Sequence, residues 1–339
     1  MNKPLSTDTA VFKLEKLQSL KAEKITAWKF IYEPLIFAVI MSVLYFVVPS
    51  NWQFVLTTGI IYTIFAASLG MLFGWTGIFT FGHMAFFGAG AYTVAVLKEF
   101  ELSPLVFLLI AGAVAGIIAA IVSLFGLRLV KVEFAMMTLI IGVIAYQLTF
   151  RIDALEGDNG IYGIPRGDVF GLNINPGTNF WWYTLILVTI ILIVMRRMSL
   201  SPFGESLNAV RDDAIKAAAV GIPVKSMRLV IFTIAGIIAG IAGGLFAQHQ
   251  GIVTPNTLSF LLGGQVIIMA LLGGMKRFWG PVIGALIFVA LNFTVFSGAS
   301  NGNFILGAIL LVIVLVFPNG VLGVVAWVKD KIFKKKELS

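Results

Sequence analysis

The densest internal group of charged side chains lies at residues 196–228, which read RRMSLSPFGESLNAVRDDAIKAAAVGIPVKSMR. Their spacing matches no paired-carboxylate, Ser-His-Asp or metal-ligand constellation, so the chain is not expected to be an enzyme or to hold a metal. Residues 221–226 have only a distant likeness to a phosphate-binding loop, because they lack its Gly-Lys-Ser/Thr ending. The stretch is therefore either a solvated loop with surface helices or a surface that docks another protein.

Helix-capping residues divide this stretch into two short helices. Ser201 can cap the first helix, with Pro202 at its first position and Glu205 in its first turn. Asp212 can cap a second helix, which ends near Gly221. The two helices are expected to lie at right angles to the neighbouring apolar segments. They would present four apolar side chains among the charges: Leu207, Val210, Ile215 and Ala218.

The rest of the chain is apolar enough to cross a membrane repeatedly. Hydrophobic residues make up 59% of its 339 residues and charged residues only 12%, and the mean hydropathy is +0.99. This composition excludes an ordinary soluble globule and predicts an all-α polytopic membrane protein. Cysteine is absent, which excludes disulfides and thiolate metal sites. The basic residues flank apolar runs, which argues for membrane topology and against a nucleic-acid partner.

Ten apolar stretches are candidates for membrane-spanning helices. With the N-terminus in the cytoplasm, ten spans place all but three of the 24 Lys and Arg residues inside, the exceptions being Lys98, Arg151 and Arg166. Both termini are then cytoplasmic, with residues 1–29 as an N-terminal segment and residues 321–339 as a basic tail flanking a transmembrane domain at 30–320. The expected spans are 31–48, 54–73, 81–97, 105–127, 132–150, 180–195, 229–248, 260–272, 281–296 and 304–317.

Ionisable side chains are scarce inside these spans, which argues against a proton-coupled carrier. Glu33 and Glu133 lie near predicted cytoplasmic span ends, where their side chains can reach the interface. His83 and Gln265 are the most polar interruptions further in, and a hydrogen-bonded buried imidazole is the plainer interpretation of His83. Other polar residues could bond across helices or line a route: Thr63, Thr138, Gln147 and Asn292.

A glycine-rich stretch at 74–97 reads GWTGIFTFGHMAFFGAGAYTVAVL. Glycine permits close backbone approach and local unwinding, which a membrane tolerates only where protein or a cavity covers the freed amides. The stretch either lines a pathway or packs tightly, and small-residue repeats at 112–116, 236–244 and 280–284 favour packing for most glycines. The candidate pathway residues are Gly77, Gly82, His83, Phe86, Phe87, Gly88 and Thr138.

Four motifs, in family order, resemble permease subunits of branched-chain amino acid ABC importers, specifically the larger, M-type member of the permease pair. They are TGIFTFGHMAFFGAGAYT at 76–93, GDNGIYGIP at 157–165, RDDAIKAAAVGIPVKSMRLVIFTIAGIIAGIAGGLFA at 211–247 and LLGGMKRFWGPVIGA at 271–285. The resemblance implies a ten-span permease of the type II importer kind in the cytoplasmic (inner) membrane of a prokaryote. It also implies a second related permease, two ATP-binding subunits that hold ATP-Mg, and an external substrate-binding protein, while this chain binds no cofactor.

The resemblance also implies which residues meet these partners. The cytoplasmic coupling loop at 196–228 would contact the ATPase through Arg211, Asp212, Asp213, Ala217, Ala218 and Gly221. The external loop at 151–179 is either a solvated connector or a docking surface, with Asp158, Asn159, Gly160 and Arg166 as docking candidates. The sequence departs from the family at Gln265, where an acidic residue is common, at Lys276 and Arg277, which replace small residues, and at Ile215 and Lys216.

The resemblance leaves three alternatives to an importer of branched-chain amino acids. The first is a permease for urea or short amides, which is the nearest relative in function. The second is a channel or secondary carrier that works without ATPase subunits. The third is a purely structural membrane scaffold.

Overall fold

The computed structural model describes residues 28, 30–100, 102–126, 129, 131–169, 171–296, 307 and 320–323. The predicted tenth span and the two predicted cytoplasmic terminal segments lie almost wholly outside these residues. Each of the other nine predicted spans falls on a helix. These are Phe30–Val47, α2 (Ser50–Gly70, continued by the π-helix η1, Met71–Thr76), α3 (His83–Val96), α4 (Pro104–Gly126), α5 (Lys131–Leu148), α6 (Gly177–Ser199), α9 (Val224–Gln250), α10 (Phe260–Gly273) and α11 (Trp279–Phe296).

Length and apolar composition allow five of the described helices to cross a membrane on their own. A sixth candidate is α5, which is bent by 92° against the short 3-10 turns that follow it. The helices α10 and α11 are shorter apolar helices that pack against each other. The prediction of an all-α polytopic membrane protein is confirmed, whereas the count of ten spans and the sidedness of the termini stay predictions.

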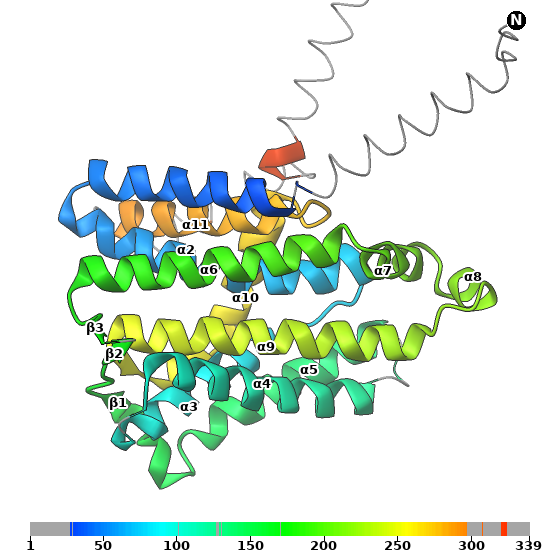
Figure 1. Ribbon diagram of the computed structural model, residues 1–339. Helices are drawn as coiled ribbons and strands as arrows, with labels where there is room; N and C mark the ends of the chain where they lie inside the picture. The colour runs from blue at the N-terminus through cyan, green and yellow to red at the C-terminus, as the bar shows by residue number, and fades with distance from the viewer. Residues whose placement is uncertain are drawn as a thin grey trace, which may run out of the picture.

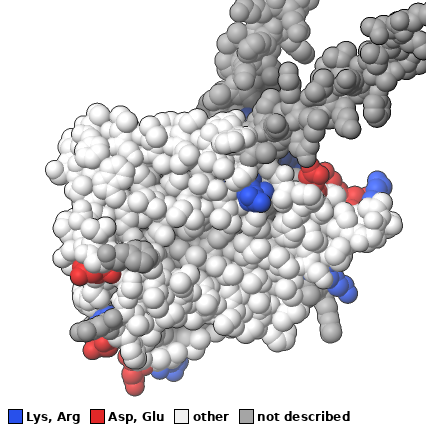
Figure 2. All heavy atoms as spheres, viewed as in Figure 1, with Lys and Arg blue, Asp and Glu red and all other residues white. Residues whose placement is uncertain are grey.

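The apolar helices lie side by side, and the chain reverses direction at two opposite ends of the bundle (Figure 1). One end carries the short helices α7 (Pro202–Asp212) and α8 (Ala214–Ala219), and we call it the α7–α8 end. The opposite end carries β1 (Ile161–Tyr162), β2 (Asp168–Val169) and β3 (Leu172–Asn173), and we call it the strand end. The charged side chains visible in Figure 2 gather toward these two ends and leave an uncharged band between them.

Small residues let α9 pack closely along α3 and α4 near the centre of the bundle. A Cβ atom on Gly90 would collide with the carbonyl oxygen of Gly240, and one on Gly243 would collide with that of Phe87. Gly112 and Gly116 of α4 lie against isoleucine side chains of α9. A Cβ on Gly284 of α11 would likewise meet the carbonyl oxygen of Met269 in α10. The interpretation of these small-residue repeats as packing surfaces is confirmed.

The predicted loop at 151–179 is folded onto the strand end. After η3 (Asp153–Leu155) and η4 (Gly157–Asn159), β1 pairs antiparallel with β4 (Ile252–Val253), and β2 pairs with β3. The turn η5 (Pro255–Leu258) leads from β4 toward α10. Ile161, Ile164 and Ile174 are buried beneath this cover. The loop is therefore a packed cap on the bundle, with only part of its surface solvated.

Candidate functional site

The two predicted short helices exist, but their caps differ in detail from the prediction. Ser201 precedes α7, yet its hydroxyl donates to the carbonyl oxygen of Met198 at 2.7 Å and does not cap the helix. The cap of α8 is Asp213, and the assignment of this role to Asp212 is wrong. One carboxylate oxygen of Asp213 accepts from the backbone N–H groups of Ile215 and Lys216, at 3.0 and 3.1 Å.

Hydrogen bonds hold Asp213 in its charged form. The backbone N–H of Lys216 lowers the pKa of the Asp213 carboxyl most, followed by the Lys216 side chain and the backbone N–H of Ile215. Since the folded pKa is below the ordinary value, the cap is complete above that ordinary value and is lost only as the pH falls through the lowered one. The helix α8 is thus capped at neutral pH and ends where Gly221 adopts φ of 90°.

The apolar side chains of the two helices divide into anchors and exposed groups. Leu207 and Val210 are fully buried because α7 packs on α6, α9 and η1, so the prediction that they are presented to solvent is wrong. Ile215 and Val220 are instead 84% and 78% exposed. We call the exposed group on α8 and its C-cap the α8 tip; it comprises Ile215, Lys216, Ala218 and Val220. Figure 1 shows α8 as the outermost element of its end.

Arg211 joins α7 to the end of the long second helix. Its guanidinium donates to the carbonyl oxygen of Gly74 and also to Asp212 at 3.0 Å. Gly74 belongs to η1, whose wider turn precedes a break at Gly77, where φ is 67°. An arginine across this point satisfies a backbone group that the irregular helix leaves available. Arg211, which is predicted to contact an ATPase, therefore contacts the end of the second membrane helix within this chain.

A cavity of about 290 Å³ opens between these elements. Phe134 and Phe232 form part of its apolar wall, and Arg228 and the segment 210–215 supply polar groups. Of the predicted pathway residues, Gly77 lies on this cavity. The cavity thus adjoins both the α8 tip and the break after η1.

The other predicted pathway residues lie in the packed interior. His83 is 1% exposed, its Nε2 lies 2.8 Å from the Ser68 hydroxyl, and its ring stacks on Phe65 at 5.5 Å between centroids. Phe86 and Phe87 are equally buried. A Cβ on Gly82 or Gly88 would collide with a neighbouring segment, at Thr138 and Leu258 respectively. A role for these residues in a pathway stays a prediction.

Arg166, a predicted docking residue, is engaged within the chain at the strand end. Its guanidinium donates to the carbonyl oxygens of Gln248, His249 and Asn175 at 3.2, 3.1 and 3.0 Å. It also lies over the ring of Phe180, 4.5 Å from the centroid. Arg166 therefore completes the C-terminus of α9, while the other docking candidates, Asp158, Asn159 and Gly160, follow one another in and after η4.

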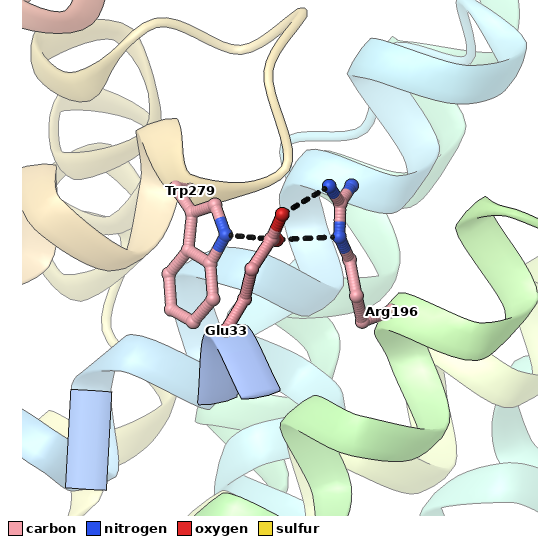
Figure 3. A network of polar contacts seen from close by, with 3 residues as sticks. All are labelled: Glu33, Arg196 and Trp279. Atoms are coloured by element: carbon pink, nitrogen blue, oxygen red, sulfur yellow. Dashed lines mark hydrogen bonds and ion pairs between the residues drawn. The ribbon is translucent and has the colours of Figure 1, made fainter. Parts of the chain in front are cut away.

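A three-residue network at the α7–α8 end could not be predicted from local sequence (Figure 3). Nε of Arg196 lies 2.8 Å from one carboxylate oxygen of Glu33, and Nη2 donates to the other at 3.2 Å. The indole N–H of Trp279 donates to the same carboxylate at 2.8 Å. The carboxylate of Glu33 is held by Arg196 and Trp279 and only 22% of its side chain is exposed, while its position at the membrane interface stays a prediction. We call Glu33, Arg196 and Trp279 the Glu33 triad.

Contacts continue from the Glu33 triad to α7. Arg196 lies over the ring of Phe278, 5.1 Å from its centroid, and Phe278 stacks with Trp75 of η1 at 6.5 Å. Gly74, which accepts the hydrogen bond from Arg211, packs against the backbone of Met275. The first helix, the end of α6, the α10–α11 loop and η1 therefore form one connected layer beneath α7.

These features define a multi-pass helical membrane protein that presents a pair of short helices at one end, anchored to the end of its second membrane helix. Among the described residues no group of three or more His, Asp and Glu side chains could hold a metal ion. The chain belongs to the family described as the permease component of the branched-chain amino acid transport system, whose model matches residues 51–314.

Individual relatives agree with this family. The chain is 27% identical to the high-affinity branched-chain amino acid transport system permease protein LivM of Salmonella typhimurium over 309 residues, which cover 81% of this chain and 73% of that one. LivM of Escherichia coli is 27% identical over 304 residues, 80% and 72% of the two chains. The permease protein LivH of Escherichia coli is 24% identical over 291 residues, 79% and 92%. No solved structure matches the chain significantly. The resemblance to M-type permeases is confirmed.

Proposed function

We propose that this chain is the transmembrane permease subunit of an ATP-driven importer and translocates branched-chain or similar hydrophobic amino acids. A second, related permease would complete the membrane part, two ATP-binding subunits would supply the driving force, and an external binding protein would deliver the substrate. The names of the LivM and LivH relatives support the substrate and the pairing. A permease for urea or short amides, or a carrier that works without ATPase subunits, is the competing function.

The observation that carries the proposal is the connection from the α8 tip through Arg211 to Gly74. An exposed apolar tip on a capped helix suits a groove on another protein, and Ile215 is its most exposed member. When the ATP-binding subunits close, movement of the α8 tip would shift η1, which continues α2, through the hydrogen bond from Arg211 to Gly74. The loop at 196–228 would thus both bind the ATP-binding subunits and transmit their motion to the membrane helices.

Charge distribution supports a cytoplasmic location of the α7–α8 end. Figure 2 shows side chains of both signs at both ends, but the described Lys and Arg residues are more numerous at the α7–α8 end, as expected if that end lies inside. The basic group comprises Arg196, Arg197, Lys225, Arg228, Lys276 and Arg277, and the acidic group comprises Asp153, Glu156, Asp158 and Asp168.

Polar substitution of the α8 tip tests the proposal. Replacing Ile215 and Val220 together by serine should lower co-purification of the ATP-binding subunits, and ATP-dependent leucine uptake, on the order of tenfold, because apolar anchors at an interface contribute about 1–2 kcal/mol. Leu172→Ser is the matched control for co-purification of the ATP-binding subunits, since Leu172 is 71% exposed at the opposite end. Leucine uptake that survives both the double substitution and ATP depletion would contradict the proposal, and urea uptake in its place would favour the competing permease.

A further inference from the structure

A second cavity, of about 370 Å³, lies between α2, α9, α10 and α11, away from the one beside α7. Its volume falls within the range of about 300–1,000 Å³ typical of small-molecule sites. The cavity belongs to the half of the bundle nearer the strand end, since Phe54 lies near the start of α2 and Gln250 is the last residue of α9. We call it the amide cavity, after three side chains in its wall: Gln250, Gln265 and Asn292.

The three amides come from three different helices and converge on one space. Gln250 ends α9, Gln265 lies in α10 and Asn292 lies in α11, and each is partly buried. Within the described part of the chain, no hydrogen bond occupies these three side chains. A partly buried amide without a hydrogen-bond partner is costly, because it has given up bonds to water without replacing them. The arrangement therefore favours a polar occupant.

The rest of the lining of the amide cavity is largely aromatic. Tyr62 and Phe246 stack at 5.8 Å between ring centroids, and Phe54, Phe288 and Phe293 complete the wall. None of the described lining residues carries a formal charge. A ligand with a net charge would be left unpaired here, whereas one with balanced charges can be held by amides, which both donate and accept.

A zwitterionic amino acid with an apolar side chain meets all of these conditions. Amide carbonyl oxygens can accept from its ammonium, amide NH₂ groups can donate to its carboxylate, and the aromatic wall can cover its side chain. Urea would use the amides but leave the aromatic wall without a counterpart. We propose that the amide cavity binds the transported hydrophobic amino acid on the strand-end side of the membrane, an inference that rests on the proposed function.

One helix also connects the amide cavity to the α7–α8 end. Thr58 and Tyr62 line the cavity, and Gly74, which binds Arg211, lies on the same continuous helix Ser50–Thr76. At a rise of about 1.5 Å per residue, Tyr62 and Gly74 are about 18 Å apart along its axis. A shift of this helix changes the cavity wall and the Arg211 contact together.

Thiol labelling tests the amide cavity, because the chain has no cysteine of its own. Val55→Cys and Val289→Cys each place one thiol in the lining of the cavity and leave its three amides in place, and Leu172→Cys in β3, a position 71% exposed and outside the cavity, is the matched control. The complete importer in membrane vesicles is treated with N-ethylmaleimide without ATP, in the presence of leucine, urea or glutamate. Labelling of this subunit is followed on a gel.

Leucine at ten times its Kd for the cavity leaves about one site in eleven empty, so both cavity cysteines should react about tenfold more slowly, and labelling of the Leu172→Cys control should not change. Urea and glutamate should not protect. Three outcomes overturn the inference: equal labelling with and without leucine, equal protection by urea, or no labelling of either cavity cysteine in a variant that inserts and assembles normally. ATP-dependent leucine uptake by the unsubstituted importer is measured in parallel, so that loss of the proposed function is recognised separately from absence of protection.

Discussion

Replacing Arg211 by leucine is expected to reduce ATP-driven leucine uptake about a hundredfold while the ATP-binding subunits still co-purify. Arg211 donates to Gly74 of η1 and to its neighbour Asp212, but it is not part of the α8 tip. Loss of a charge-assisted hydrogen bond costs up to about 3 kcal/mol, and each 1.4 kcal/mol corresponds to a factor of ten. The substitution should therefore uncouple the bound ATP-binding subunits from α2 without removing the surface to which they bind.

Two further variants separate this effect from a general loss of charge. Arg197→Leu removes an exposed arginine at the end of α6 that lies over Phe30, 5.2 Å from the ring centroid, and should leave uptake nearly unchanged. Arg211→Lys keeps the charge but not the forked geometry of the guanidinium, so its uptake should lie between that of Arg211→Leu and that of Arg197→Leu. Uptake by Arg211→Leu at the unsubstituted rate would disprove the coupling role. Parallel loss of co-purification would instead move Arg211 into the docking surface.

Periodic and local features were predictable from the sequence because they need only nearby residues. Apolar runs of sufficient length located nine of the described helices, and the glycine repeats predicted the close packing that is found between α4 and α9 and between α10 and α11. The helix α8 ends just before Gly221, as predicted, and Gly221 has the positive φ of 90° that favours glycine. The interpretation of His83 as a hydrogen-bonded buried imidazole is also confirmed, by its contact with Ser68.

Features that depend on the packing of distant segments were not predictable. The amphipathic pattern of α7 shows that Leu207 and Val210 share a face, but whether that face meets solvent depends on η1 and α9. The Arg211–Gly74 contact joins residues 137 positions apart. The cap assignment missed by one residue because Asp212 and Asp213 are chemically equivalent, and Arg211 is the neighbour that engages Asp212.

The Glu33 triad was the largest omission, since its members are 163 and 246 positions apart and Glu33 alone resembles an interfacial residue. Three elements that must stay in register beneath α7 meet in it: the first helix, the end of α6 and the start of α11. The side chains of Glu33 and Arg196 are only 22% and 16% exposed, so their pairing is screened little by water. The triad is therefore expected to stabilise the layer against which α7 moves.

Removing one partner of this pair should destabilise the protein more than removing both. Glu33→Gln or Arg196→Met should each lower the free energy of unfolding by about 3 kcal/mol, because the remaining charge is left partly buried without its counterion. The double variant should recover part of that loss, and Trp279→Phe, which removes one hydrogen bond and keeps the ring, should cost about 1.5 kcal/mol.

The free energies are measured by reversible unfolding in mixed detergent micelles, with Arg197→Met as the matched control for loss of an exposed arginine at the same helix end. Strictly additive losses in the double variant would show that Glu33 and Arg196 act independently and would disprove the triad. If the double variant shows a coupling energy between Glu33 and Arg196, the uptake rates of the variants decide what the triad does. A variant that unfolds more easily yet transports at the normal rate per assembled complex leaves the triad as a support for the layer, whereas slower transport by an assembled complex places it in the path from α7 to the first helix.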